Sequence, residues 1–197
     1  GVSEPTASRI VRHVEDCLIQ SGLFNLPKKL PDGEGIDWNV VIIDATEIPI
    51  QRPKKQSSCY SGKKKAHTFK VQAIIHSRTQ QILCMSKGAV HNFELFKCNF
   101  YVVSKNSFIL GDKGYQVIYA LYADSLLPSK AKKRCGLYSV PRGYHREMNK
   151  TRIGIEHVFG SLKTFKILAE RYRNRGKRLG LRFNLIAGIY NLELCKK

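Results

Sequence analysis

Three acidic residues, Asp44, Asp112 and Glu156, occupy positions from which their carboxylates could act together on metal ions. Asp44 follows the apolar run at 40–43, which predicts a strand buried on both faces. Asp112 ends a second short apolar strand, expected at 107–110, and Glu156 lies beside the apolar stripe of a long helix. If the two strands are parallel neighbours, both aspartates reach one edge of the sheet. Carboxylates that converge in this way can hold a pair of divalent cations for phosphoryl transfer.

Each acid also has an ordinary structural explanation. Asp112, two residues before Gly114, is compatible with an Asx turn, and Glu156 follows Arg152 at the spacing of a helical surface ion pair. Asp44 is harder to explain in this way, because an acid beside a buried core usually has a partner, a cap or a metal. Taken singly, these alternatives remain open.

The hydrophobic pattern indicates the elements that must position the acids. Strands are expected at 40–43, 68–75, 81–86, 107–110 and 126–128, the first three as a meander. Helices are expected at 3–21, 93–103, 115–122, 146–170 and 181–194. This order matches an α/β class of the ribonuclease-H-like type, a mixed sheet with flanking helices. We expect a helical remnant of a helix-turn-helix at 1–26, a linker rich in Pro, Gly and Asp at 27–39, and a catalytic domain at 40–197.

The charge of the chain points to a polyanionic partner. Its 34 Lys and Arg residues against 15 Asp and Glu residues give a formal net charge of +19. Nucleic acid fits better than a membrane, because the basic residues are interleaved with Tyr, Asn and Gly and because no apolar run is long enough for a span. The six cysteines include no Cys-x-x-Cys pair, which argues against a zinc site or a disulfide framework.

Two basic clusters are candidates for phosphate contacts, although a solvated loop is the alternative for the first. The first cluster, expected near the acids, comprises Arg52, Lys54, Lys55, Lys63, Lys64, Lys65 and Lys70. The second cluster comprises Arg171, Arg173, Arg175, Lys177 and Arg178.

Five motifs enclose these residues in order along nearly the whole chain. They are DATE at 44–47 with Pro49 and Arg52-Pro53, YSGKKK at 60–65 with His67, GDKGYQ at 111–116, the stretch 152–163 around Glu156-His157, and YRNR at 172–175. This set of motifs resembles that of the insertion-sequence transposases of the DDE superfamily, in the group named for insertion sequence five. That group is akin to the eukaryotic Harbinger type.

The resemblance implies an enzyme that cuts DNA at transposon ends and joins those ends to target DNA. It implies that Asp44, Asp112 and Glu156 are the catalytic, metal-binding acids, with two Mg²⁺ (or Mn²⁺) ions as cofactors. Arg152 and Lys163, on the same helix as Glu156, join the DNA-binding candidates. The implied partners are transposon-end and target DNA, bound by a dimer. The implied location is the bacterial nucleoid in the cytoplasm, or the nucleus if the source is eukaryotic.

The chain departs from the family pattern at Asn92, Val117 and Ser129, and residues 2–15 match only the second half of an upstream helix-turn-helix. These departures leave open a domesticated or decayed relative that binds DNA without catalysis. A ribonuclease-H-like nuclease acting on branched or hybrid duplexes is a third alternative.

Overall fold

The structure is a computed structural model of the 197-residue chain. It describes residues 1–26, 40–53, 59–88, 108–112, 114–115, 118, 125–126, 142–174 and 177–196. The predicted linker at 27–39 and helix at 93–103 lie outside these residues, as do the departures at Asn92, Val117 and Ser129 and most of the helix expected at 115–122.

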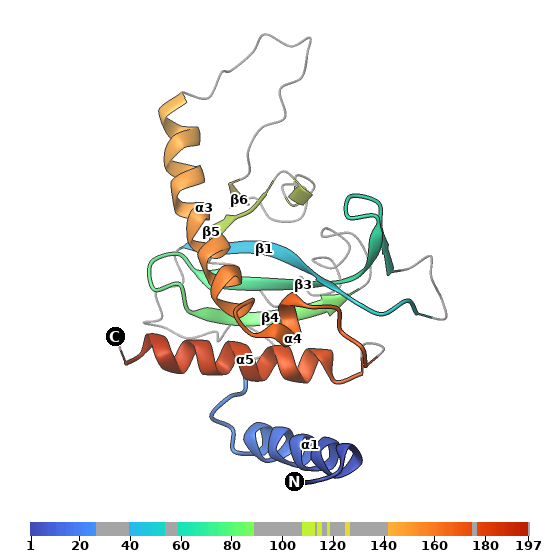
Figure 1. Ribbon diagram of the computed structural model, residues 1–197. Coiled ribbons are helices and arrows are strands. Elements are labelled where there is room, and N and C mark those ends of the chain that lie inside the picture. The colour runs from blue at the N-terminus through green and yellow to red at the C-terminus, as the bar shows by residue number, and fades with distance from the viewer. Residues whose placement is uncertain are drawn as a thin grey trace.

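In the described part of the chain, six strands form one mixed sheet (Figure 1). Strands β3 and β4 extend the sheet on one side of β1, and β5 and β6 extend it on the other. The pairs β1–β3, β3–β4 and β2–β3 are antiparallel, whereas β1–β5 and β5–β6 are parallel. The meander and the mixed α/β class are therefore confirmed. The strand bounds are β1 Val40–Pro49, β2 Tyr60–Ser61, β3 Ala66–His76, β4 Ile82–Gly88, β5 Phe108–Leu110 and β6 Ser125–Leu126.

Strand β1 is much longer than its apolar run predicts. The prediction that Asp44 ends the strand was wrong, because Ala45–Pro49 continue the antiparallel pairing with β3 as far as Thr68. Alternation along β1 puts Asp44 on the same face as Ile42 and Ile48, both fully buried. The sequence does contain a signal for this longer strand. Thr46, Ile48 and Ile50, which are buried, alternate with Glu47 and Pro49, which are less buried, as in a half-buried antiparallel strand.

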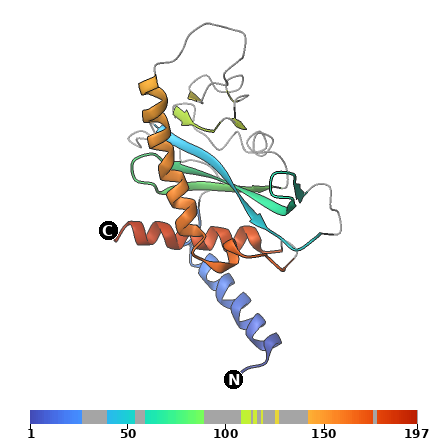
Figure 2. The ribbon, with the colours of Figure 1, turned by 45° about the horizontal axis from the view of Figure 1, so that its top comes forward.

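The helices α3 (Arg142–Leu162) and α5 (Leu179–Leu194) cover that face of the sheet (Figure 2). In α3 the buried residues Ile155, Val158, Phe159 and Leu162 recur at helical spacing and join the core of β1 and β3. One of the sheet's faces is thus closed by helices that cross it, as in the expected fold.

The single helix predicted at 146–170 is in fact two, α3 and α4 (Lys166–Ala169). The hydroxyl of Thr164 donates to the carbonyl of Ser161 at 2.8 Å, and Phe165 then adopts an extended conformation with ψ of 110°. This turn lets Leu168 reach the core while Phe165 stays exposed. The apolar spacing of the sequence did not reveal the break.

Helix α1 (Glu4–Gln20) lies against α5 on the side away from the sheet (Figure 1). Arg178 donates to Glu15 at 2.9 Å and to Asp16 at 2.6 Å, and Arg182 donates to Glu15 at 2.6 Å. None of the α1 residues is buried, so this ionic contact rather than an apolar core holds the helix in place. None of the described helices is long and apolar enough to cross a membrane.

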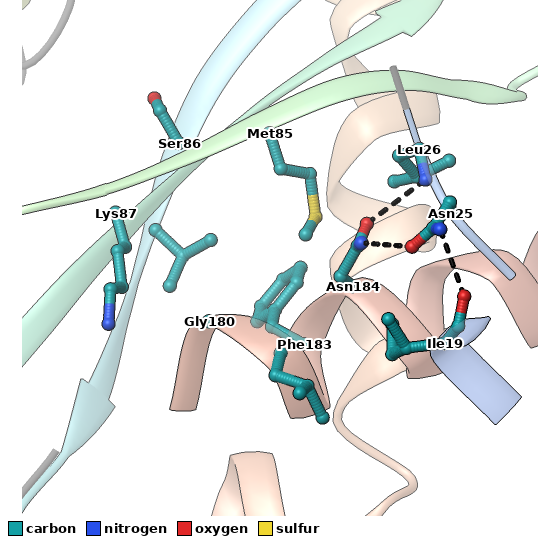
Figure 3. A pocket seen from close by; sticks show the side chains of 11 residues that line it. Ile19, Asn25, Leu26, Met85, Ser86, Lys87, Gly180, Phe183 and Asn184 are labelled. Atoms are coloured by element: carbon teal, nitrogen blue, oxygen red, sulfur yellow. Dashed lines mark hydrogen bonds between the residues drawn. The ribbon is translucent and has the colours of Figure 1, made fainter. Parts of the chain in front are cut away.

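The segment after α1 is fixed to α5 by the amide of Asn184 (Figure 3). Its oxygen accepts from the backbone of Leu26 at 3.2 Å, and its nitrogen donates to Asn25 at 3.4 Å. Beside them a largely apolar cavity of about 520 Å³ opens between β4 and α5, and none of the three acids lines it. Further along α5, Gly188 lets the backbone of Phe24 approach closely, since a β-carbon there would lie 2.8 Å from Phe24.

Gly188→Ala should therefore destabilise the fold. Overpacking against backbone costs about 1–3 kcal/mol, which exceeds or offsets the gain of roughly 1 kcal/mol from helix propensity. Gly160→Ala is the matched control, because Gly160 is also helical and its β-carbon would meet nothing within 4 Å. We expect the free energy of unfolding in urea to fall for the first variant and to rise by about 0.5–1 kcal/mol for the second. Equal gains in both would contradict the close approach.

Candidate active site

The parallel pairing of β1 with β5 brings two of the three acids together. Its register pairs Val41 with Ile109 and Ile42 with Leu110. Asp112 lies two residues beyond the end of β5, and the same register, extended by two residues, would set it opposite Asp44. The assumption that the two strands are parallel neighbours is thus confirmed, and both aspartates lie just beyond the last residue pair of β1 with β5.

Asp44 is mostly buried, and its surroundings change the pKa of its carboxyl group. Burial raises this pKa, and the negative charges of Asp112 and Glu156 raise it further. The backbone N–H of Ala45, which donates to the Asp44 carboxylate at 2.7 Å, and the charge of Arg152 act in the opposite direction. The net shift of this pKa is upward, and its causes show that Asp112 and Glu156 both act electrostatically on Asp44.

Helix α3 supplies both Glu156 and Arg152. Glu156 is exposed beside the buried Ile155, as expected from the helical stripe. The side chain of Arg152, 15% exposed, places Nη2 3.5 Å from Oδ1 of Asp112. Its Nε is buried without a hydrogen-bond partner among the described residues. The ion pair of Arg152 is therefore made with Asp112 on β5 and not with Glu156, the partner that helical spacing suggests.

The donors at this site suit a hard divalent cation in kind, since all three are carboxylates. Among the described residues, however, no group of three or more His, Cys, Asp or Glu side chains lies close enough to hold a metal ion. The acids are electrostatic neighbours with a guanidinium beside one of them. Holding a cation would require their carboxylates to draw closer together.

A buried hydrogen bond fixes the turn that follows Asp112. The backbone N–H of Tyr115 donates to the carbonyl of Asp112 at 2.9 Å, and the fully buried Tyr115 hydroxyl accepts from Nε2 of Gln72 at 2.9 Å. Ser86 on β4 donates to Oε1 of Gln72 at 3.3 Å. Tyr115 belongs to the GDKGYQ motif, but the sequence does not reveal its partner Gln72, because nothing in the strand pattern marks a buried amide as a partner for a residue 43 positions away.

Comparisons with known proteins identify the family of the chain. The DDE superfamily endonuclease family matches residues 43–191, a span that contains all three acids. The chain belongs to this family. It is also 45% identical over 205 residues to a protein of Microchaete diplosiphon named "Probable transposase for insertion sequence element IS702". That match covers 100% of this chain and 73% of the relative. No solved structure matches the chain.

The first basic cluster of this DDE endonuclease lies further from the acids than expected. Because β1 continues to Pro49, the loop after it begins about 17 Å along the strand from Asp44. Lys63, Lys64 and Lys65 are exposed on the turn between β2 and β3, and Arg52 is exposed after β1. Lys54 and Lys55 lie outside the described residues.

Lys70, a member of this cluster, and Lys163 connect the cluster to β1 and α3. Lys70 forms an ion pair with Glu47 at 3.9 Å, and Thr68 donates to the same carboxylate at 3.4 Å, which agrees with a structural role for Glu47. Lys163, two turns beyond Glu156, has its pKa lowered by burial and by the nearby charge of Lys64, while Glu47 opposes the shift. The positive charge thus extends from the hairpin onto the end of α3.

The second basic cluster of the endonuclease divides into two parts. Arg171 and Arg173 are exposed and line an open hollow of about 1000 Å³ with Lys166 and Arg182. Lys177 is also exposed, whereas Arg178 is engaged with Glu15 and Asp16 of α1. Arg175 lies outside the described residues. The geometry gives Arg178 a role in holding α1, a role that sequence reasoning did not assign.

Tyr115→Phe should destabilise the endonuclease, because it removes an acceptor of the buried Gln72 amide. The expected loss in the free energy of unfolding is about 1–3 kcal/mol. Tyr60→Phe is the control, since Tyr60 is 55% exposed and should change stability by no more than about 0.5 kcal/mol. Denaturant titration of both variants gives the comparison. A Tyr115→Phe protein as stable as Tyr60→Phe would show that this hydrogen bond contributes little.

Proposed function

We propose that this chain is the catalytic part of an insertion-sequence transposase that cuts DNA at transposon ends and joins them to target DNA. The observation that carries the proposal is the register of β1 with β5, which, extended by two residues, would set Asp112 opposite Asp44, with Glu156 acting on the same site from α3. The family match and the printed name of the relative from Microchaete diplosiphon support it. The proposed division is a helical remnant at 1–26, a linker at 27–39 and the catalytic domain at 40–197.

In this proposal Asp44, Asp112 and Glu156 hold divalent cations, two Mg²⁺ (or Mn²⁺) ions. When bound, the cations would supply the activation of water for cleavage and of the freed 3′-hydroxyl for strand transfer. Asp44 provides a carboxylate on a central strand of the sheet, and the hydrogen bond from the backbone N–H of Ala45 holds one of its oxygens in place. Glu156 provides the exposed carboxylate, from a position on α3 beside the apolar stripe that is anchored in the core.

The basic surfaces are proposed to hold the DNA backbone. The distance of about 17 Å between Asp44 and the end of β1 corresponds to about five base-pair steps of duplex. A duplex that places one phosphate at the acids could therefore reach Lys163 and the lysines between β2 and β3. Arg171 and Arg173 offer a further contact. Because two transposon ends must be joined, we expect two copies of the chain to act together on DNA.

The decisive experiment measures nicking and strand transfer on duplex DNA with Mg²⁺ or Mn²⁺. Asp112→Asn should reduce both activities by at least about 100-fold, because removing one member of a catalytic unit costs orders of magnitude. Glu193→Gln, an exposed acid on α5, serves as the control and should retain activity. Equal activity in Asp112→Asn and wild type would contradict the mechanism. DNA affinity that survives chelation, with no cleavage at any divalent concentration, would favour a relative that binds DNA without catalysis.

Charge reversal tests each basic surface separately. If Lys63 and Lys64 each neutralise one phosphate, reversing both to Glu should reduce the slope of log affinity against log salt by about 1.8. The same reduction is expected for Arg171→Glu with Arg173→Glu. Lys196→Glu, at the exposed end of the described chain, should leave the slope unchanged. If the salt dependence of affinity does not change, the surface concerned does not contact the DNA backbone.

A further inference from the structure

Arg152 carries a permanent positive charge at the site of the three acids, in contact with Asp112. A guanidinium stays protonated at any relevant pH, whereas three neighbouring carboxylates repel one another when they are ionised. Arg152 contacts Asp112 through Nη2 and also acts on Asp44 electrostatically. It stands one helical turn before Glu156 on the same helix. Arg152 therefore offsets part of the mutual repulsion of the acids.

The contact of Arg152 with Asp112 is loose. At 3.5 Å it is longer than the roughly 2.7–2.9 Å of a charge-assisted hydrogen bond. The buried Nε also lacks a partner among the described residues, which leaves the guanidinium short of acceptors. Arg178 shows the contrast within the same chain, because it donates to two carboxylates at 2.9 and 2.6 Å. A guanidinium held by one long contact can be moved at much lower cost than one held in a fork.

A movement of Arg152 away from Asp112 would affect how a cation binds the acids. No three of the described acidic, His or Cys side chains are close enough together to hold a cation, and Arg152 contacts Oδ1, one of the two oxygens with which Asp112 could bind one. A divalent cation that enters the site would be repelled by the positive charge of Arg152. It would also neutralise the carboxylate charges that Arg152 otherwise neutralises. The two positive charges therefore compete for the same carboxylate.

We infer that Arg152 is a displaceable internal counter-cation, which holds Asp112 until a divalent cation binds the acids and then moves off that carboxylate. The inference rests on the proposed function, because it requires that these acids bind metal. A displaceable Arg152 and a purely supportive Arg152 predict opposite changes in metal affinity when the residue is removed. If Arg152 only held the acids in position for the cation, its removal would weaken metal binding. If it competes with the cation, its removal strengthens binding.

The experiment measures Mn²⁺ binding to the protein alone by isothermal titration calorimetry at fixed pH and without DNA. Arg152→Gln should bind Mn²⁺ about tenfold more tightly than wild type, since one unit charge no longer opposes the ion. Arg152→Lys keeps the charge and should stay within about threefold of wild type. Lys150→Gln is the matched control, because Lys150 is an exposed cation two residues earlier on α3, and its affinity should not change.

Thermal unfolding provides a second readout, independent of activity. Without divalent cations, Arg152→Gln should melt below wild type, and saturating Mn²⁺ should raise its midpoint by more than it raises that of wild type. Mn²⁺ affinity of Arg152→Gln that is equal to or below that of wild type would overturn the inference while leaving the metal site intact. Absence of Mn²⁺ binding in wild type would overturn both the inference and the proposed function. If Arg152→Gln does not fold, Arg152→Lys provides the test alone. A change of about tenfold or more in its Mn²⁺ affinity would overturn the inference, because the charge is retained.

Discussion

The parallel pairing of β1 with β5 is the constraint on which the rest of the site depends. Side chains alternate along a strand, so a slip of one residue in this register would turn Asp112 to the opposite face from Asp44. Only three residue pairs define the register, and they lie immediately before the two acids. The buried residues Ile109 and Leu110 make a slip costly, because it would exchange their faces. Core packing thereby fixes the relative placement of two polar groups.

The helices add the third acid and the charge balance. The apolar side of α3 is anchored to β1 and β3, so the turn that carries Arg152 and Glu156 is fixed where it crosses the sheet. Two further carboxylates beside the mostly buried Asp44 would be costly for a purely structural cluster, and such groupings are typical of functional sites. Burial of Asp44 and its acidic neighbours both act to raise its pKa, and only Ala45 and Arg152 counter them.

Much of this arrangement could be predicted from the sequence, because it depends on local patterns. The apolar run before Asp44, the short strand before Asp112 and the stripe beside Glu156 each encode an element, and their order indicates the fold. The parallel neighbours were an assumption that the structure confirmed. The identification of the three acids as metal ligands stays a prediction that the structure does not test.

Other features could not be predicted, because they depend on contacts distant in sequence. The extent of β1 is set by its pairing with β3, and the break before α4 by the hydroxyl of Thr164 and the path of Phe165. The pairing of Arg152 with Asp112, against the simpler pairing within the helix, depends on how α3 crosses the sheet. The engagement of Arg178 with α1 depends on two acids more than 160 positions away.

The three acids also stand on elements of very different local stability. Asp44 lies within nine residue pairs of β1 and β3, whereas Asp112 follows a strand with three pairs to β1 and two to β6. Local opening in proteins is graded, and short elements near a sheet margin open at a lower free energy than central strands. Amide hydrogens around Asp112 should therefore exchange with solvent well before those around Asp44. The site thus combines an acid on a stable central strand with an acid beside a strand that opens more easily, and Arg152 contacts the second.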